Sequence, residues 1–158
     1  MRPTRRSLAL ALVAAVLACA PRGPQPIAYG TESCDVCRMT ISDQRFATAA
    51  TTATGRTVRF DAVECLAGWV AAQDKAPRAV WVTDASHPGT LITVADAEFY
   101  RAGAGRSPMG NGYVALARSG DRSAAGLAAA EGPFTWQQVR DAVAREGLGP
   151  APAVVGVR

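Results

Sequence analysis

The sequence predicts an α+β fold made of two small ββαβ units in tandem. Short β-type segments bounded by turn residues alternate with amphipathic helical segments along the 158 residues. The order strand, strand, helix, strand is clear in the first half and weaker in the second. Once an N-terminal export signal is removed, about 140 residues remain, which suits one ordinary domain or two very small ones.

The N-terminus has the pattern of an export signal over residues 1–18. Three arginines precede an apolar run at residues 8–18, which is too short to span the ~30 Å core of a bilayer as a helix. The run ends in Val-Leu-Ala-Cys at residues 16–19, which resembles a bacterial lipoprotein signal, so we expect Cys19 to be lipidated. An ordinary secretory signal is the alternative, and residues 4–8 also resemble a twin-arginine signal.

Lipidation at Cys19 predicts a mature protein that is anchored to the inner or the outer membrane and faces the periplasm. More than one acyl chain makes dissociation negligible, because each buried methylene contributes ~0.8 kcal/mol. Residues 19–31 are rich in proline and are expected to form an extended tether. Loss of three signal arginines changes the balance of basic to acidic residues from 17:13 to 14:13. The near-neutral remainder has no basic stripe that would favour nucleic acid.

The first unit spans about residues 40–88. Its predicted elements are two strands, a helix and a strand, at residues 46–52, 56–60, 61–73 and 79–84. A Thr-Gly pair at residues 54–55 predicts that the first two strands form a hairpin. Asp61 is placed to cap the helix.

The second unit spans about residues 89–146 and repeats the plan less clearly. Its predicted elements are two strands and two helices, at residues 91–94, 112–117, 122–131 and 133–143. Thr135 is placed to cap the last helix. Residues 147–158 contain two prolines and are expected to form a loose tail.

The most informative stretch is the Cys-x-x-Cys-x-Met motif at residues 34–39. Thiolates alone suit zinc, iron–sulfur clusters or copper, whereas a thioether favours Cu(I) over zinc, so Met39 is the discriminating residue. Cys37 and Met39 are two residues apart, so their side chains leave the same face of an extended segment. Cys34 can join them if the chain turns, and Asp35 offers an oxygen donor.

The number of cysteines limits the disulfide chemistry. With Cys19 lipidated, Cys34, Cys37 and Cys65 remain, and an odd number excludes a complete disulfide framework. A Cys34–Cys37 disulfide and a redox-active Cys-x-x-Cys site are alternative interpretations. A thioredoxin-like pair follows a strand and begins a helix, whereas this pair follows a proline-rich tether. Cys65 lies among apolar helix residues, which favours a packed thiol over a ligand.

Other candidate residues have more ordinary interpretations. Met109 lies in a loop rich in Gly and Pro, where metal ligand, lid and plain packing are equally plausible roles. His87 is the single histidine and is expected to face solvent in a turn, which excludes a zinc site with several histidines. Asp61 is expected to be a helix cap rather than a general base. The sequence contains no Gly-rich phosphate loop and no Ser-His-Asp pattern, which favours a binding protein over an enzyme.

Three motifs together resemble the NosL family, the accessory lipoproteins of nitrous-oxide reductase. They are the Cys-x-x-Cys-x-Met motif, Phe60-Asp61 before the helix that carries Cys65, and Ser-Pro-Met-Gly at residues 107–110. The resemblance implies a copper-binding domain over residues 32–146 with a fold related to organomercurial lyase. It also implies a metallochaperone that binds Cu(I) and delivers it to apo nitrous-oxide reductase in denitrification. Other copper-assembly proteins are further candidate partners.

Carried over to this chain, the resemblance implies Cys37 and Met39 as copper ligands, with Cys34 or Asp35 as a further donor and Met109 as a secondary candidate. The family commonly has glycine where this chain has Arg38. We expect Arg38 to restrict the backbone to ordinary φ, and its charge to lower the pKa of the neighbouring thiols.

Two other functions remain open on the sequence. The chain could be a thiol enzyme that uses Cys34 and Cys37, either a thiol–disulfide oxidoreductase or an organomercurial-lyase-like enzyme. It could also be a structural lipoprotein with disulfide-bonded cysteines. A single Cys-x-x-Cys-x-Met motif per chain leaves coordination positions of the copper ion unfilled, and a second chain could fill them. Both a monomer and a copper-linked dimer are therefore expected alternatives.

Overall fold

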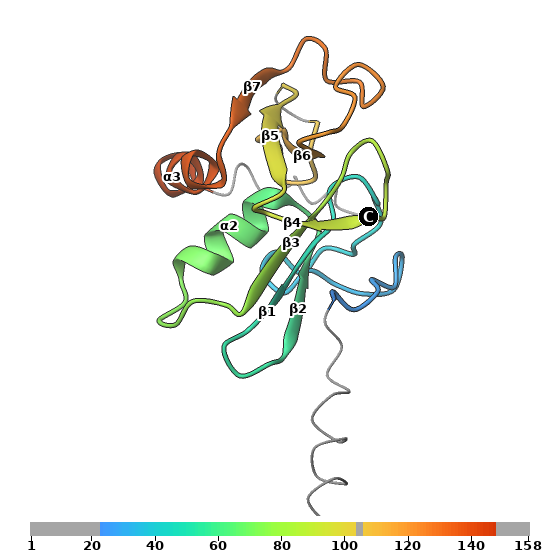
Figure 1. Cartoon of the computed structure of the whole chain (residues 1–158). Coiled ribbons are helices and arrows are strands. Elements are labelled where there is room, and N and C mark those ends of the chain that lie inside the picture. The colour runs from blue at the N-terminus through green and yellow to red at the C-terminus, as the bar shows by residue number, and fades with distance from the viewer. Residues whose placement is uncertain (1–22, 104–105, 148–158) are drawn as a thin grey trace, which may run out of the picture.

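The computed structural model describes residues 23–103 and 106–147, and its elements there confirm the α+β prediction. Strands form two antiparallel sheets, and two helices, α2 and α3, pack with them (Figure 1). The predicted signal with Cys19, the start of the tether and residues 148–158 of the tail lie outside the described residues. Neither helix in the described ranges is long and apolar enough to cross a membrane.

The first sheet has the strand order β2-β1-β3-β4, with every neighbouring pair antiparallel. Its strands are β1 (Thr48–Thr51), β2 (Thr57–Phe60), β3 (Ala79–Thr83) and β4 (Leu91–Thr93). The predicted hairpin of β1 and β2 is confirmed, and Gly55 makes its turn possible with a φ of +95°. The predicted turn at residues 86–89 leads to β4, and His87 is exposed there as expected.

The second sheet has the order β6-β5-β7. Its strands are β5 (Ala97–Arg101), β6 (Tyr113–Ala117) and β7 (Glu131–Phe134). Hydrogen bonds from the end of β3 join the two sheets: the Ala85 N–H donates to the Ala115 carbonyl at 2.9 Å, and the Ala117 N–H donates to the Asp84 carboxylate at 3.3 Å. The two sheets therefore belong to one packed body.

Helix α2 (Val63–Ala71) occupies the centre of that body, between the first sheet and α3 (Figure 1). Its first five residues are buried, and Trp69 packs on Phe60 with ring centroids 5.5 Å apart. Helix α3 (Trp136–Glu146) covers the other side of α2 with an apolar face that includes Val139 and Val143. Burial of these apolar faces supplies the main driving force for the arrangement.

The predicted helix at residues 122–131 is wrong, because this segment forms successive turns. The Asp121 carboxylate accepts from the N–H groups of Ser123 and Ala124, and the Arg122 side chain donates to the Leu127 and Ala130 carbonyls. Side-chain bonds of this kind compete with helical backbone bonds. Most of this segment is exposed, and only Leu127 is buried, with Ala125 and Ala130 packed beside it.

Helix α3 begins later than predicted, because residues 131–134 form β7 and pair with β5 instead of starting the helix. The sequence did not predict this strand. The cap at Thr135 is confirmed: the Gln138 N–H donates to Thr135 Oγ1 at 3.3 Å, and the Thr135 N–H donates to Gln138 Oε1 at 2.7 Å. This reciprocal pair is a capping box, which satisfies N–H groups that the helix itself cannot.

Glu64 joins α2 to the loop that precedes β6. Its Oε1 accepts from Ser107 Oγ at 2.5 Å and from the Tyr113 N–H at 3.3 Å, and Ser107 Oγ accepts from the Gly112 N–H at 2.9 Å. Burial raises the pKa of the Glu64 carboxyl, although these hydrogen bonds oppose the shift. The Ser-Pro-Met-Gly motif is thus held against the first turn of α2.

We expect Glu64→Gln to remove a pH dependence from the free energy of unfolding. Since the pKa of Glu64 is raised in the folded state, its ionisation weakens the fold as the pH rises above the ordinary value of 4.5. Glutamine keeps an acceptor for Ser107 but does not ionise, so the stability of the variant should increase relative to that of wild type as the pH is raised from 4.5 through neutrality. Urea unfolding across this range measures the difference. The exposed Glu131→Gln is the control, and a Glu64→Gln effect that is constant with pH would contradict the prediction.

Candidate metal centre

The Cys-x-x-Cys-x-Met motif forms a closed backbone turn at the edge of the core. Ser33 and Thr40 make an antiparallel bridge, and the Cys34 N–H donates to the Met39 carbonyl at 2.8 Å. Cys34 and Met39 therefore face each other across a short ribbon. Facing residues of an antiparallel pair project to the same side, with Cβ atoms about 4.5–5.5 Å apart. The sequence analysis expected Cys34 to approach Met39 only if the chain turns here, and the structure contains that turn.

Arg38 closes the turn with a φ of +66°, so the prediction that it keeps an ordinary φ is wrong. Its N–H donates to the Cys34 carbonyl at 3.1 Å, and a turn this tight forces the residue into the left-handed region. A non-glycine residue pays roughly 1–2 kcal/mol for that conformation. The arginine side chain itself is exposed.

Asp35 fixes the turn to the end of β2. Its N–H donates to the Arg59 carbonyl at 2.9 Å, and its carboxylate Oδ2 accepts from the Arg59 N–H at 2.9 Å. The other carboxylate oxygen lies 3.7 Å from the Arg56 guanidinium. Asp35 is therefore engaged with β2, and the structure does not bring it to the sulfur atoms.

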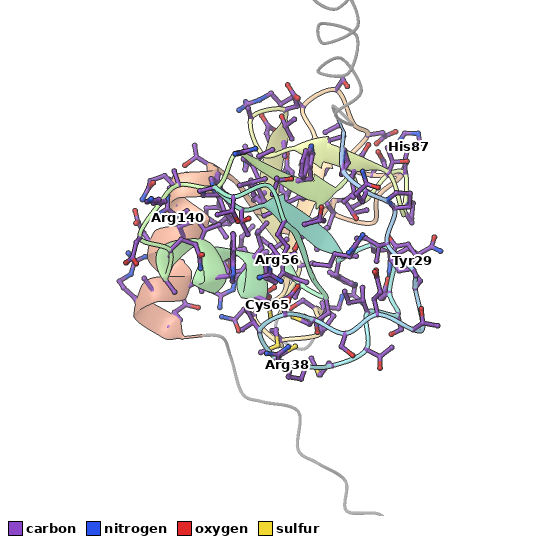
Figure 2. All side chains as sticks on the ribbon, turned by 90° about the horizontal axis from the view of Figure 1, so that it is seen from below. Tyr29, Arg38, Arg56, Cys65, His87 and Arg140 are labelled. Carbon is purple, nitrogen blue, oxygen red and sulfur yellow. The ribbon has the colours of Figure 1, made fainter. Side chains whose placement is uncertain are left out.

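Four donor side chains meet beneath this turn. The ligand atoms of Cys34, Cys37, Asp61 and Cys65 all lie within 4.8 Å of one another. Figure 2 shows Cys65 and Arg38 on the same side of the molecule, with sulfur atoms gathered near them. All three cysteines are free thiols, so the alternative of a Cys34–Cys37 disulfide is not the state seen here. Cys37 is half-buried and forms the edge of the group, whereas Cys34 and Cys65 are fully buried.

The expectation that Asp61 caps the helix is wrong. The N-cap of α2 is Ala62, which has an extended backbone and no capping side chain. Asp61 precedes the cap, and its Oδ1 accepts from the Cys37 thiol at 3.3 Å. The residue is only 3% exposed, and no described residue donates a hydrogen bond to its Oδ2. One buried carboxylate oxygen is thus left without a partner inside the group of thiols.

The pKa values of the three thiols are driven apart. Cys65 donates to Cys34, and backbone N–H groups also do so, which lowers the pKa of Cys34 to about 6 despite its burial. Burial raises the pKa of Cys37 to about 12, and the neighbouring Cys34 thiolate adds to this. The pKa of Cys65 is raised because its thiol donates to Cys34 and is buried. The prediction that Arg38 lowers the pKa of its neighbours is wrong for Cys37.

This arrangement suits capture of a thiophilic metal ion. Cys34 supplies a thiolate at neutral pH, and metal binding displaces the protons of the other thiols. Of the residues proposed from sequence, Cys34 and Cys37 belong to the group, and Met39 is half-buried against the same core. Met109 is buried in the same hydrophobic core, and its predicted role as a secondary ligand stays a prediction.

Asp61 and Cys65 are the members of the group that the sequence did not favour as ligands. Both belong to the segment that runs from the end of β2 into α2. The signal that pointed to them was their presence in one of the three family motifs, together with the odd number of cysteines that follow Cys19. Sequence spacing alone could not show that the turn at residues 34–39 is placed against this segment.

Comparison with known protein families decides the classification. The model of the NosL family matches residues 27–142, which is most of the chain. The chain belongs to the NosL family. No significant match is found among curated proteins or among solved structures. NosL proteins are copper-binding accessory proteins, and the group of three thiols and a carboxylate supports a copper-binding role for this member.

The left-handed conformation of Arg38 leads to a stability prediction. We expect Arg38→Gly to stabilise the fold by about 1 kcal/mol, because glycine adopts positive φ without the Cβ clash. Chemical denaturation of the reduced, metal-free protein measures the gain. Arg38→Ala is the matched control, since it removes the same charged side chain but keeps Cβ. An equal gain in both variants would show that charge, and not backbone strain, is responsible.

Proposed function

We propose that this NosL protein is a membrane-anchored metallochaperone that binds Cu(I) and delivers it for assembly of the copper centres of nitrous-oxide reductase. The periplasmic location and the anchor rest on the sequence of residues 1–19, and the partner rests on the family resemblance. The chain acts by binding and release, without turnover.

The observation that carries the proposal is the gathering of three free thiols at one edge of the core. Thiolates are ligands that Cu(I) prefers, and the fold holds them close enough to share an ion. Cys34 and Cys65 form the buried floor, whereas Cys37 and Met39 are only half-buried. An acceptor protein could therefore exchange ligands one at a time, beginning at the accessible edge.

Met39 is the residue expected to favour copper over other thiophilic ions. Its backbone faces that of Cys34 across the ribbon, which supports the prediction that its thioether points to the same side. A thioether needs no deprotonation and is a poor ligand for zinc. Copper held by Cys37, Met39 and a buried thiolate would be bound tightly but would remain open to an incoming ligand.

Anaerobic titration with Cu(I) against a competing chelator tests the binding step. We expect the reduced protein to bind about one copper per chain, and Met39→Leu or Cys37→Ser to weaken binding by at least about 100-fold. Leucine preserves the apolar volume of methionine while removing the sulfur. His87→Gln is the control, because it removes the exposed imidazole without touching the thiols. Wild-type protein that fails to compete would refute copper carriage.

The delivery step needs a separate measurement. Copper-loaded protein is mixed with copper-free nitrous-oxide reductase, and recovery of the reductase absorption bands and activity is followed. We expect transfer to be faster and more complete than from a chelator buffered to the same free Cu(I) concentration. The same rate from protein and chelator would leave a copper-binding protein that is not a chaperone for this enzyme.

A second candidate function is favoured by one contact. The Asp61 carboxylate lies 3.3 Å from Cys37 Sγ, so the thiols have the neighbouring acid that an organomercurial-lyase-like enzyme requires. In such a reaction two thiolates would hold Hg(II) while a proton passes to carbon, which breaks the carbon–mercury bond and releases the hydrocarbon. Met39→Leu discriminates the two functions, because it should strongly weaken Cu(I) binding and leave this protonolysis unchanged. Release of hydrocarbon from methylmercury measures the second activity.

A further inference from the structure

Residues 24–32 are fastened to the domain, although this segment forms no helix or strand of its own. Ile27 is 8% exposed and belongs to the hydrophobic core, and Tyr29 packs against the same core. The Arg59 guanidinium of β2 donates to the Pro26 carbonyl at 3.2 Å. The segment that precedes the thiol turn is therefore part of the packed body.

Glu32 and the backbone hold the second half of this segment. The Glu32 carboxylate Oε2 accepts from the Ala28 N–H at 2.9 Å and lies 3.2 Å from Arg59 Nε. The Gly30 N–H donates to the Ile41 carbonyl, and the Ile41 N–H donates to the Glu32 carbonyl, both at 2.9 Å. Because ion pairs near the surface contribute little, the backbone bonds and the buried apolar side chain supply most of the attachment.

The attachment leaves only a short connection to the predicted lipid anchor. Five residues of chain lead from Cys19 to Pro24, and they reach at most about 18 Å when fully extended. A domain of about 120 residues is about 35 Å across. A free tether over residues 19–31 would reach about 43 Å, which is enough for the domain to turn in any direction. A connection of half the domain width keeps the region around Pro24 next to the membrane.

The surface at this point has a composition that suits a lipid headgroup layer. A groove of about 300 Å³ lies between residues 24–27 and the start of β4, where Gly89 and Leu91 line it. Most of the residues that line the groove are apolar. Residues 23–28 and 85–93 contain no acidic side chain, so none of them repels anionic lipids.

We propose that the groove face, formed by residues 23–28 and 86–91, lies against the bilayer surface and that the thiol turn at residues 34–39 points away from it. Figure 2 shows Arg38 and Cys65 at the edge of the molecule opposite to the start of the pale blue ribbon. A partner would then reach the thiols from the aqueous side. The inference rests on the lipid anchor of the proposed function but not on copper binding.

Energy transfer to acceptor lipids tests this orientation. Full-length protein lipidated at Cys19 is placed in vesicles of phosphatidylethanolamine and phosphatidylglycerol, with a fluorophore at Thr90 or at Arg38. Both positions are exposed, and coupling through an azido amino acid leaves the thiols unlabelled. We expect transfer from Thr90 to be at least about twice that from Arg38, because they lie toward opposite sides of a domain about 35 Å wide.

Insertion of about 20 Gly and Ser residues between Arg22 and Gly23 is the control, since a flexible linker of this length frees the domain to rotate. We expect the difference between the two fluorophore positions to shrink. Intact mass separates the possible failures. Protein without acyl chains on Cys19 would refute the anchor and this inference with it. Acylated protein with equal transfer from both positions would overturn the orientation alone, whereas loss of copper binding would leave it standing.

Discussion

The paired hydrogen bonds between Asp35 and Arg59 are the constraint on which the metal centre depends. They fix the turn at residues 34–39 to the end of β2, one residue before the chain passes through Phe60 to Asp61. Two segments separated by about two dozen residues are thereby held in register. Without this attachment, the thiols of the turn and those of α2 would belong to separate parts of the surface.

Burial then determines the chemistry of the donors. Cys34 and Cys65 form part of the hydrophobic core, where one can hold a charge only if hydrogen bonds from the other and from the backbone support it. The pKa of Cys34 is lowered, and the Cys34 thiolate contributes to the raised pKa values of Cys37 and Cys65. The group therefore presents one thiolate and two thiols beside the Asp61 side chain, and metal binding would displace the protons of the two thiols. Two residues near the site are energetically unfavourable in the folded state. Arg38 adopts a left-handed backbone conformation, and Glu64 is a carboxyl group whose ionised form is disfavoured by burial.

The proposed chaperone function requires both tight binding and release, and the position of the site suits both. The floor of the site is rigid, because α2 is packed between the first sheet and α3. Its rim is a short turn with Cys37 and Met39 half-buried. A protein that carries a metal ion needs this asymmetry, since ligands buried on all sides would make exchange slow, and ligands exposed on all sides would leave the thiols open to oxidation.

The sequence by itself determined the α+β class, the β1–β2 hairpin, the Thr135 cap and the soft-donor character of residues 34–39. These features depend on residue type and short-range spacing, which act locally. The sequence did not determine the turns at residues 122–131, because side-chain hydrogen bonds outweighed the local helix propensity. It also did not determine strand β7, which forms because it pairs with β5. Only the tertiary structure brought Asp61 and Cys65 to Cys34 and Cys37, and it left Asp35 outside the group. The reason is physical: a ligand set shared by two segments is defined by how their backbones pack, and that packing has no signature in the spacing of either segment.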